Sequence, residues 1–415
     1  MDLDIKRSFT WLTFGSAVTH PLWLWFTIVL LVGTLGEAEF GVINAALAFM
    51  MIAAGITSMG GGRYIVRHVA GQRELGPRFF SNFFLLHLVV ATIVYFLATG
   101  FGSSIGYTGD KLLALMLAGV YAMAFSVTSL CRSLFRAHEE LRWLSMSLMF
   151  EKAAVVGLGV LLVLGRPTAV GALTGMAMGM VLTLIANLSV VVTHFKSLKL
   201  SALKRGFLKK HLSRAIPFGL ISFFTAIYMR TDQIMVNAIS GDAANGYYSL
   251  AYQILEAAVL IPVFLIDSVF PRLSSLNWER TSGVFRSLLT RSIVFATGFG
   301  VLVAAAMYVF AGDLIVLVQF LSGSAEFDSA VQPLRILVWT LPIMGVNGLI
   351  ASALLAQDDQ EILALGFAVA AGFNVMANLA LIPSFGPAGA AATTVMTQLL
   401  VAACLLLRYK YRTRT

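Results

Sequence analysis

Twelve apolar runs recur along this chain of 415 residues, each about as long as the roughly 20-residue helix that crosses a bilayer. They lack the alternation of polar and apolar residues that marks the strands of a membrane barrel. The chain is 59% hydrophobic and 12% charged, and its mean hydropathy of +0.86 excludes a water-soluble domain. The sequence therefore predicts an all-α polytopic membrane protein with twelve transmembrane helices, near 9–32, 41–61, 80–100, 111–131, 143–164, 169–193, 215–239, 247–270, 290–311, 334–356, 361–383 and 388–407.

The distribution of Lys and Arg predicts the orientation of these helices. With a cytoplasmic start, 24 of the 29 Lys and Arg residues fall in cytoplasmic segments and three fall in outer loops. Because short cytoplasmic loops carry an excess of Lys and Arg, both termini are expected to be cytoplasmic. The net charge of +9 is then explained by topology, and no nucleic-acid partner is expected. The opening "MDLDIKRS" leads into a full-length apolar run, so we expect no cleavable leader.

Short internal repeats suggest two lobes of six helices each. "GEAEFG" at 36–41 and "GDAANG" at 241–246 fall in corresponding loops, as do "AVGA" at 169–172 and "PAGA" at 387–390. Six is an even number, so both lobes enter the membrane with the same polarity and form a parallel repeat, with a substrate site between them. We expect a first lobe over 1–195 and a second over 215–415, together enclosing a V-shaped central cavity.

The segment between the lobes, residues 196–214, is rich in lysine. It reads "KSLKLSALKRGFLKKHLSR", with Leu200, Leu203 and Phe207 at helical spacing. A basic amphipathic helix on the cytoplasmic leaflet is one interpretation. An ordinary basic linker is the other.

Three stretches resemble one family of transporters. "RTDQIMVNAISGDAANGYYSLAYQILEAAVLIPVFLIDSVFPRLS" is similar to the start of the second half in polysaccharide-exporter flippases. "NVMANLALIPSFGPAGAAATT" resembles the last hairpin of that family, and "LVGTLGEAEFG" resembles its first loop. The resemblance implies a bacterial member of the multidrug/oligosaccharidyl-lipid/polysaccharide exporter superfamily. Its implied branch is the polysaccharide transporters, which are flippases for undecaprenyl-diphosphate-linked oligosaccharides in O-antigen, capsule or exopolysaccharide assembly.

That branch implies further expectations about location and partners. The protein would lie in the bacterial cytoplasmic (inner) membrane and work by alternating access as a monomer. A polysaccharide polymerase and a chain-length regulator would be its protein partners. No cofactor is expected, apart from Na⁺ or H⁺ as a coupling ion.

Four charged side chains are candidate substrate-binding residues. Arg230 precedes Ala243 by 13 residues and Glu256 follows it by 13, so the two meet at one depth if the seventh and eighth helices fold back there. Either they form an inert ion pair, or Arg230 clamps the diphosphate and Glu256 holds it in the empty state. Lys152 in the fifth span is a second candidate cation, and its neighbour Glu151 is expected to point elsewhere. Arg63, after "GGG", is either an entry contact or a positive-inside anchor.

Oxygen-bearing side chains at matching depth form a candidate cation site. Asp232, Asn374, Asn378 and Thr394 offer a carboxylate, two amides and a hydroxyl, which suit a hard cation. The resemblance adds that the related lipid II flippases build a sodium site at the matching positions. This sequence departs from that pattern at Asn378, where that branch can carry a second acid. Polar packing within the helix bundle is the alternative.

Two other functions remain open at this point. A multidrug or cation antiporter of the related branch fits twelve helices and a cation site equally well. A lipid-linked-sugar glycosyltransferase would need an outer domain, and although Glu37 and Glu39 form an acidic pair, the outer loops are short. No phosphate-binding Gly-x4-Gly-Lys-[Ser/Thr] motif occurs, so ATP hydrolysis is excluded and we expect no enzyme. Tyr247 and Tyr248 are typical of the outer membrane interface.

Overall fold

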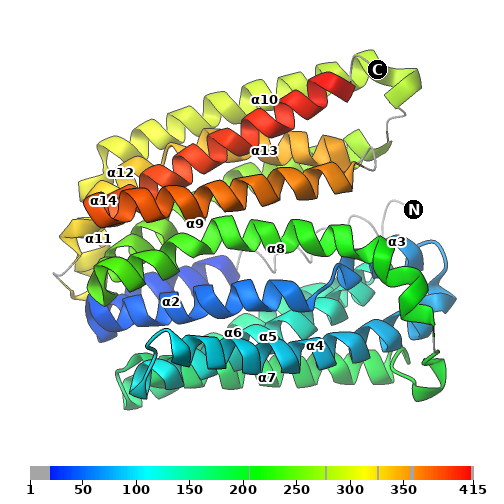
Figure 1. Cartoon of the computed structure of the whole chain (residues 1–415), viewed down its shortest axis with the longest axis horizontal. Helices are drawn as coiled ribbons and strands as arrows, with labels where there is room; N and C mark the ends of the chain where they lie inside the picture. Colours follow the sequence, from blue (N-terminus) through cyan, green and yellow to red (C-terminus); the bar gives the residue numbers. More distant parts are fainter. Residues whose placement is uncertain (1–18, 205, 276–277, 325–326, 356–358, 413–415) are drawn as a thin grey trace. The chain divides into compact units, whose positions relative to one another are not determined.

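The structure is a computed structural model that describes residues 19–412 except 205, 276–277, 325–326 and 356–358. At 200, 260–282 and 412 it describes the backbone alone. Throughout these residues the regular elements are helices, which confirms the all-α prediction (Figure 1). Eight of the described helices are long and apolar enough to cross a membrane, or nine if the bent pair Asp328–Leu337 and Thr340–Leu355 counts as one span. The chain is therefore a membrane protein, and the count of twelve stays a prediction.

The chain divides into two compact units. Unit 1 covers Met1–Phe223 and unit 2 covers Phe224–Thr415, so the boundary lies inside helix α8 (Phe207–Ser240). The V-shaped cavity between lobes stays a prediction.

Unit 1 is a bundle of long helices joined by short turns. At Gly36 the backbone has a φ of 71°, which breaks the helix between the first and second predicted spans. A second break at Ser58–Gly60 separates the short helix α3 from α2. In order, the elements are η1 (Trp25–Leu31), α2 (Val32–Thr57), α3 (Gly61–Val69), η2 (Arg73–Leu75), α4 (Gly76–Ser104), α5 (Gly109–Ala137), α6 (Leu141–Gly165), α7 (Ala169–Thr193), η3 (Leu200–Ala202) and the start of α8.

Glycines on α7 let its backbone approach that of α6. A methyl group added at Gly175 would lie 2.3 Å from the carbonyl oxygen of Leu158, and one at Gly179 would lie 2.6 Å from that of Ala154. Small residues four apart are the usual means by which membrane helices pack closely. This contact holds α6, which carries Glu151 and Lys152, against a rigid neighbour.

The predicted linker over 196–214 is helical in its second part, residues 207–214, which begin α8. Among the described residues of 196–204 and 206, Leu200–Ala202 is the helical part, as the short element η3, and α8 begins at Phe207. The side chain of Asn82 on α4 donates a hydrogen bond to the Ala202 carbonyl at 3.0 Å. Phe207, on the predicted apolar face, is buried against the same helix. Because side chains of α4 satisfy backbone groups of the segment, it is held against α4 within unit 1.

In unit 2 the last helix is a hairpin, although its helical assignment is continuous. Asp359 and Arg408 are hydrogen-bonded, but a straight helix would hold residues 49 apart at about 74 Å. The chain reverses at Gly386, where φ is 54°, and Figure 1 shows the orange and red halves of α14 running back along each other. The elements are the rest of α8, α9 (Asp242–Ser275), α10 (Trp278–Val309), α11 (Ala311–Ser322), η4 (Asp328–Ala330), α12 (Val331–Leu337), α13 (Thr340–Leu355) and α14 (Gln360–Arg412).

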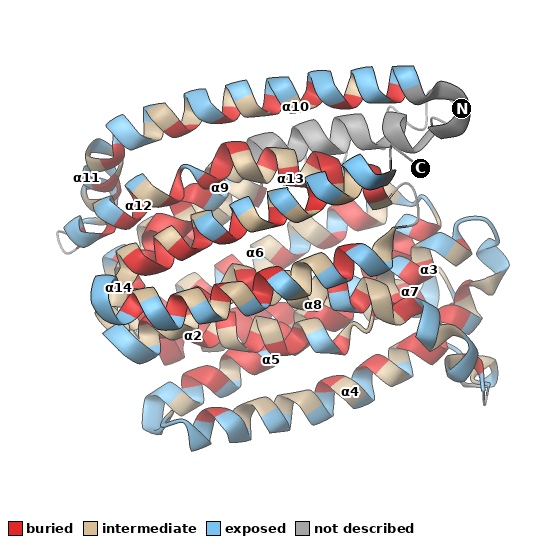
Figure 2. Ribbon diagram, turned by 45° about the horizontal axis from the view of Figure 1, so that its top comes forward, coloured by how far each residue is buried: buried red, intermediate tan, exposed pale blue. Residues whose placement is uncertain are grey.

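Both units expose apolar side chains along whole helices. Phe96 and Leu97 on α4 are 68% and 67% exposed, and Val294 and Leu302 on α10 are each 66% exposed. Figure 2 shows exposed residues recurring along both helices. Apolar surface of this extent is expected where lipid takes the place of water.

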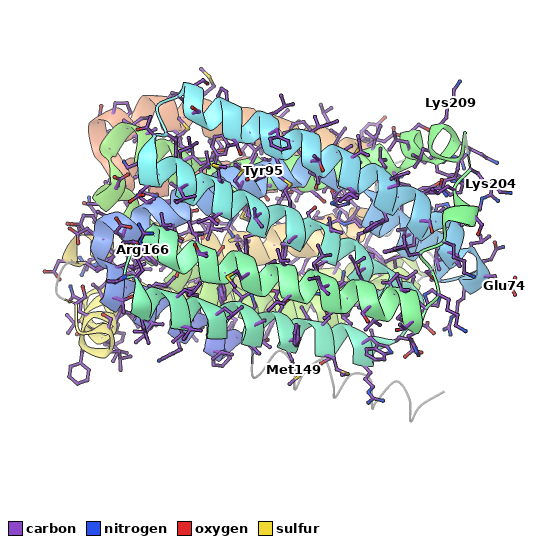
Figure 3. All side chains as sticks on the ribbon, turned by 90° about the horizontal axis from the view of Figure 1, so that it is seen from below. Glu74, Tyr95, Met149, Arg166, Lys204 and Lys209 are labelled. Atoms are coloured by element: carbon purple, nitrogen blue, oxygen red, sulfur yellow. The ribbon has the colours of Figure 1, made fainter. Side chains whose placement is uncertain are left out.

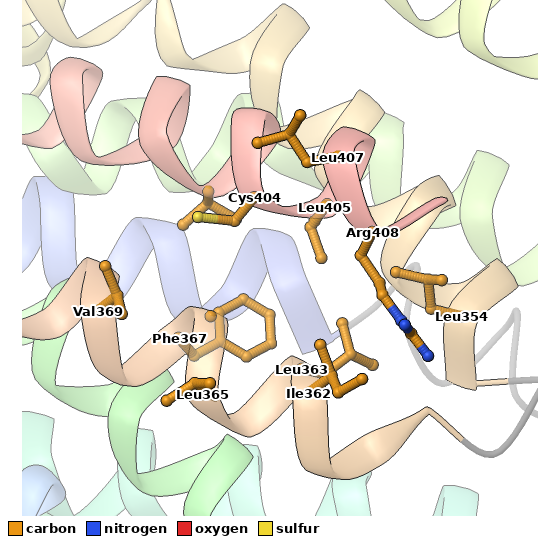
Figure 4. Close-up of a pocket in the computed structure, with 12 residues that line it drawn as sticks. Leu354, Ile362, Leu363, Leu365, Phe367, Val369, Cys404, Leu405, Leu407 and Arg408 are labelled. Carbon is orange, nitrogen blue, oxygen red and sulfur yellow. The ribbon is translucent and has the colours of Figure 1, made fainter. Parts of the chain in front are cut away.

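A clasp between charged side chains closes the open end of the α14 hairpin. Arg408 donates to Asp359 through Nη2 at 2.8 Å and through Nε at 3.2 Å, and the two side chains are 18% and 10% exposed. Arg408 stands at the end of an apolar cavity of about 230 Å³ lined by α13 and both halves of α14 (Figure 4). The paired geometry fixes both charges where little water reaches them.

We predict that Asp359→Asn lowers the stability of the protein by about 1.5–3 kcal/mol, the usual worth of hydrogen bonds to a charged group. The substitution leaves the shielded guanidinium of Arg408 without its counter-charge. Thermal unfolding of the purified protein in detergent measures the effect. Glu361→Gln, which removes a charge from an exposed position two residues away, is the control. Equal melting temperatures for both variants would contradict the prediction.

Candidate functional site

The ion pair expected between α8 and α9 is present. These helices fold back on each other at Gly241, which has a φ of 94°. Nη2 of Arg230 lies 3.0 Å from Oε1 of Glu256, and the two side chains are 33% and 43% exposed. The guanidinium also lies 5.9 Å from the ring centroid of Tyr252, one helical turn before Glu256. Arg230 is therefore paired and partly exposed, and its role as a substrate contact stays a prediction.

Asp232 lies two residues further along α8 and is fully buried. One carboxylate oxygen, Oδ2, accepts hydrogen bonds from the Tyr248 hydroxyl and from Oγ1 of Thr394, the latter at 3.0 Å. The other oxygen, Oδ1, accepts from the backbone N–H of Gln233 at 3.0 Å. Its contacts are with uncharged donors, so this buried group brings a negative charge that a cation can offset.

A second polar pair lies in the same unit. Asn378 donates through Nδ2 to Oδ1 of Asn374 at 3.1 Å, and Asn374 donates to Oγ1 of Thr397 at 3.2 Å. Thr397 and Thr394 are three residues apart, so they share one face of the second half of α14. The four predicted ligands thus form two hydrogen-bonded pairs, Asp232 with Thr394 and Asn374 with Asn378. The pairs meet at the second half of α14, where Thr394 contacts Asp232 and Thr397, one turn later, contacts Asn374.

This donor set fits a small hard cation. Oδ1 of Asn378 is a buried atom for which no hydrogen-bond partner is found among the described residues. Buried oxygens without partners are costly, and a bound ion would satisfy them. Asp232 would supply the charge, with Thr394 and Asn378 supplying neutral oxygens. Whether all four predicted ligands reach one ion stays a prediction.

Tyr248 lies elsewhere than its residue type predicts. It was expected at the outer interface, but it is fully buried and donates to Asp232. A signal was present in the spacing: Tyr248, Tyr252 and Glu256 recur every four residues, which places all three on one face of α9. That face meets Arg230 and Asp232, so the tyrosines belong to the polar interior of unit 2.

Lys152 in unit 1 belongs to a cluster of three charges. Its Nζ lies 3.1 Å from Oε1 of Glu151, whose Oε2 lies 2.7 Å from Nη1 of Arg132. Glu151 was expected to point away from Lys152, and that expectation is wrong. The lysine side chain is long enough to reach its neighbour, and its Nζ also lies 4.0 Å from the ring centroid of Trp23. Arg132, counted as a cytoplasmic charge in the sequence, is buried in the same cluster.

Arg63 is exposed in the first turn of α3. The helix begins after Gly60, whose φ is 73°, and an added methyl group there would lie 1.9 Å from the Ala215 carbonyl oxygen. The next residue, Tyr64, is buried and its hydroxyl lies 2.9 Å from Nδ1 of His211. Burial raises the pKa of the Tyr64 hydroxyl, while nearby Arg214 opposes that shift. Arg63 thus stands on a well-anchored helix, and its role as an entry contact stays a prediction.

Solved structures of known transporters share the fold. A multidrug resistance transporter of the MATE family and the MOP superfamily, in an inward-facing conformation, matches with a TM-score of 0.76 at 14% identity, covering 96% of each chain. The lipid II flippase MurJ, in an inward closed conformation, matches with a TM-score of 0.71 at 14% identity, covering 96% of this chain and 87% of that one. A MOP superfamily transporter from Pyrococcus furiosus matches with a TM-score of 0.71 at 13% identity, covering 99% and 95%.

Sequence comparison points in the same direction. A probable low-salt glycan biosynthesis flippase of Haloferax volcanii is 25% identical over 249 residues, which make up 58% of this chain and 49% of that protein. This chain thus matches about half the length of that curated relative. The named relatives are flippases and transporters rather than enzymes, as the sequence predicts. The sequence model of one family, described as polysaccharide biosynthesis protein, matches residues 5–277, which is well over half of the 415 residues, and the chain therefore belongs to that family.

Proposed function

We propose that the protein is a flippase that moves an undecaprenyl-diphosphate-linked oligosaccharide from the cytoplasmic to the outer leaflet by alternating access. Membership of the polysaccharide biosynthesis protein family and the partial match to a glycan flippase support a lipid-linked glycan as the substrate. The observation that carries the proposal is the Arg230–Glu256 pair, a partly exposed guanidinium within a membrane helix. Ionisable residues inside membrane helices mark substrate pathways more often than not.

The pair can exchange one anion for another. A guanidinium presents parallel N–H donors that match two oxygens of a phosphate. The diphosphate replaces the Glu256 carboxylate on Arg230 when the substrate enters, and the carboxylate returns when the substrate leaves. Arg230 therefore keeps a counter-charge in both states. Outward movement of the anion is favoured by an interior-negative potential, by about 2.3 kcal/mol per charge per 100 mV.

A coupling cation, Na⁺ or H⁺, resets the empty carrier. Asp232 is its charged residue, and Asn374, Asn378 and Thr394 provide neutral oxygens around it. Binding an ion there neutralises the one buried carboxylate of the cluster. The bound ion therefore favours a compact arrangement of unit 2 in which Asp232 is neutralised. Without the ion, an arrangement in which Asp232 reaches water is favoured instead.

The remaining expectations follow from the proposed substrate. The protein lies in the bacterial inner membrane with both termini cytoplasmic and acts as a monomer. A polymerase and a chain-length regulator use the exported units in O-antigen or exopolysaccharide assembly.

The second candidate is a multidrug or cation antiporter. The match to a multidrug transporter fold and the buried Asp232 favour it. Active efflux of cationic dyes from cells that express the protein would support this candidate. The Arg230–Glu256 pair favours an anionic substrate instead, since a cationic drug would be repelled by Arg230.

We predict that Arg230→Ala reduces export of surface polysaccharide by at least about 100-fold, the equivalent of losing a bidentate charge-assisted pair worth about 3 kcal/mol. Arg230→Lys should retain part of the activity, because it keeps the charge but not the fork. Glu256→Gln should be milder, since phosphate replaces the carboxylate in the loaded state. Surface polysaccharide is measured in a flippase-deleted host at matched protein levels.

Arg335→Ala is the matched control, because it removes an exposed guanidinium of unit 2 that lies 5.7 Å from the Tyr308 ring centroid. Its export should equal that of the wild type. Near-normal export by Arg230→Ala would rule out the clamp.

We also predict that Asp232→Asn makes transport independent of the cation gradient. The amide keeps an oxygen for Tyr248 and Thr394 but loses the charge that binds the ion. Transport of a fluorescent lipid-linked oligosaccharide in proteoliposomes, with a sodium or a pH gradient imposed in turn, measures the effect. Asp313→Asn, at an exposed position in α11, is the control. Unchanged gradient dependence in Asp232→Asn would remove this residue from the coupling site.

A further inference from the structure

The charged cluster of unit 1 carries a surplus positive charge in the middle of a membrane helix. It contains Arg132, Glu151 and Lys152, whose side chains are 6%, 2% and 23% exposed. Two cations share one carboxylate, so the cluster has a formal charge of +1. In α6 (Leu141–Gly165), Lys152 lies about 17–20 Å from either end at 1.5 Å per residue.

Arg132 uses its donors inside the protein. Nη1 pairs with Glu151, Nε donates to Oγ of Ser147 at 2.8 Å, and Nη2 donates to the Ser147 carbonyl at 3.1 Å. Three nitrogens are thus fixed to groups of α6. Arg132 and Glu151 form a buried neutral unit, and the surplus charge belongs to Lys152.

The groups around Lys152 stabilise its ammonium group but do not cancel the positive charge of the cluster. The Trp23 ring attracts the ammonium group through its π face at 4.0 Å. Glu151 already shares its charge with Arg132. Lys152 is also the most exposed of the three charged side chains. A positive surplus at this depth is stabilised by an anion and opposes uptake of a cation or proton, which would raise the charge to +2.

We infer that Lys152 and Trp23 form an anion site of unit 1 that binds a phosphate of the lipid-linked diphosphate. Lys152 donates N–H to a phosphate oxygen, which brings the cluster to neutrality. Glu151 is a positioning residue: anchored by Arg132, it holds Lys152 against Trp23 and stays in place when the anion binds. Arg230 must give up Glu256 to bind an anion, whereas Lys152 keeps its carboxylate. The inference rests on the proposed function for its ligand.

The test uses the purified full chain in lipid nanodiscs and measures equilibrium binding of farnesyl diphosphate. Farnesol and inorganic pyrophosphate are the comparison probes. The variants are Lys152→Gln, Lys152→Arg and Arg230→Gln. Lys209→Gln, an exposed site at one end of unit 1 (Figure 3), controls for the loss of one positive charge.

Wild type should bind farnesyl diphosphate more tightly than farnesol. Lys152→Gln should weaken that binding about tenfold or more, the effect of losing one charge-assisted hydrogen bond. Lys152→Arg should restore most of it and Lys209→Gln should change nothing. The melting temperature of Lys152→Gln should stay the same or rise, because the variant leaves the neutral Arg132–Glu151 pair intact. A residue that served structure alone would show the opposite pattern.

Equal affinities for Lys152→Gln and Lys209→Gln would overturn the inference. If Arg230→Gln weakened binding in that case, the proposed function would be retained and only the inference about Lys152 would be lost. If the wild type bound farnesyl diphosphate no more tightly than farnesol, both the inference and the proposed function would be overturned. If it bound pyrophosphate as tightly as farnesyl diphosphate, the site would be one for free phosphate and the inference of a lipid ligand would be overturned. If Lys152→Gln did not fold, Trp23→Leu would decide: we expect weaker binding, and unchanged affinity would overturn the inference.

Discussion

The cost of charge in hydrocarbon is the constraint on which the polar interior of this protein depends. An ionised side chain near the middle of a membrane helix costs about 2.5–3.5 kcal/mol on insertion scales, so it needs a partner or a ligand. Arg230 meets this demand with Glu256 and Arg132 meets it with Glu151. Asp232 is surrounded by hydroxyl and amide donors. Each arrangement leaves a different net charge, and the chemistry of the protein follows from these differences.

The features set by helix continuity could be predicted from sequence. Apolar length and composition predict the all-α membrane fold. Counting equal numbers of residues on either side of a turn predicts the contact of Arg230 with Glu256, because the rise per residue in two uninterrupted helices is constant. The same counting, made from the reversal at Gly386, places Asn374 at the depth of Thr397 in the α14 hairpin and Thr394 one turn nearer the reversal. The contact of Asp232 with Thr394 has the same origin, since both lie a few turns from glycine-containing reversals.

The contacts that depend on how far a flexible side chain can reach, or on which acceptor a hydrogen-bond donor pairs with, could not be predicted from the sequence. The rule that neighbours on a helix diverge describes Cβ directions, and the four-carbon stem of Lys152 is long enough to turn back to Glu151. Arg132 looked like a surface charge because it lies near a helix end, yet a buried carboxylate draws it inward. Tyr248 looked like an interface residue by type, and its hydroxyl is used instead by Asp232. Of the predicted linker, residues 207–214 are helical as the start of α8, and the backbone before them accepts a hydrogen bond from Asn82 at Ala202.

The formal charges of the clusters suit opposite ligands, as the proposed function requires. The unit 1 cluster has a surplus of +1, the Arg230–Glu256 pair is neutral, and the Asp232 cluster has a charge of −1. On these proposals an anion would bind at Lys152 without any carboxylate moving, while at Arg230 it would exchange with one. A cation is drawn to Asp232, two residues from Arg230 on the same helix. In the proposed cycle the diphosphate occupies Arg230 in the loaded carrier and the cation occupies Asp232 in the empty one, so a change of partner at Arg230 would alter the field in which Asp232 binds its ion. Such a coupling is reciprocal by thermodynamic necessity. The short spacing between Arg230 and Asp232 is thus sufficient to link the proposed substrate to the proposed coupling ion within unit 2.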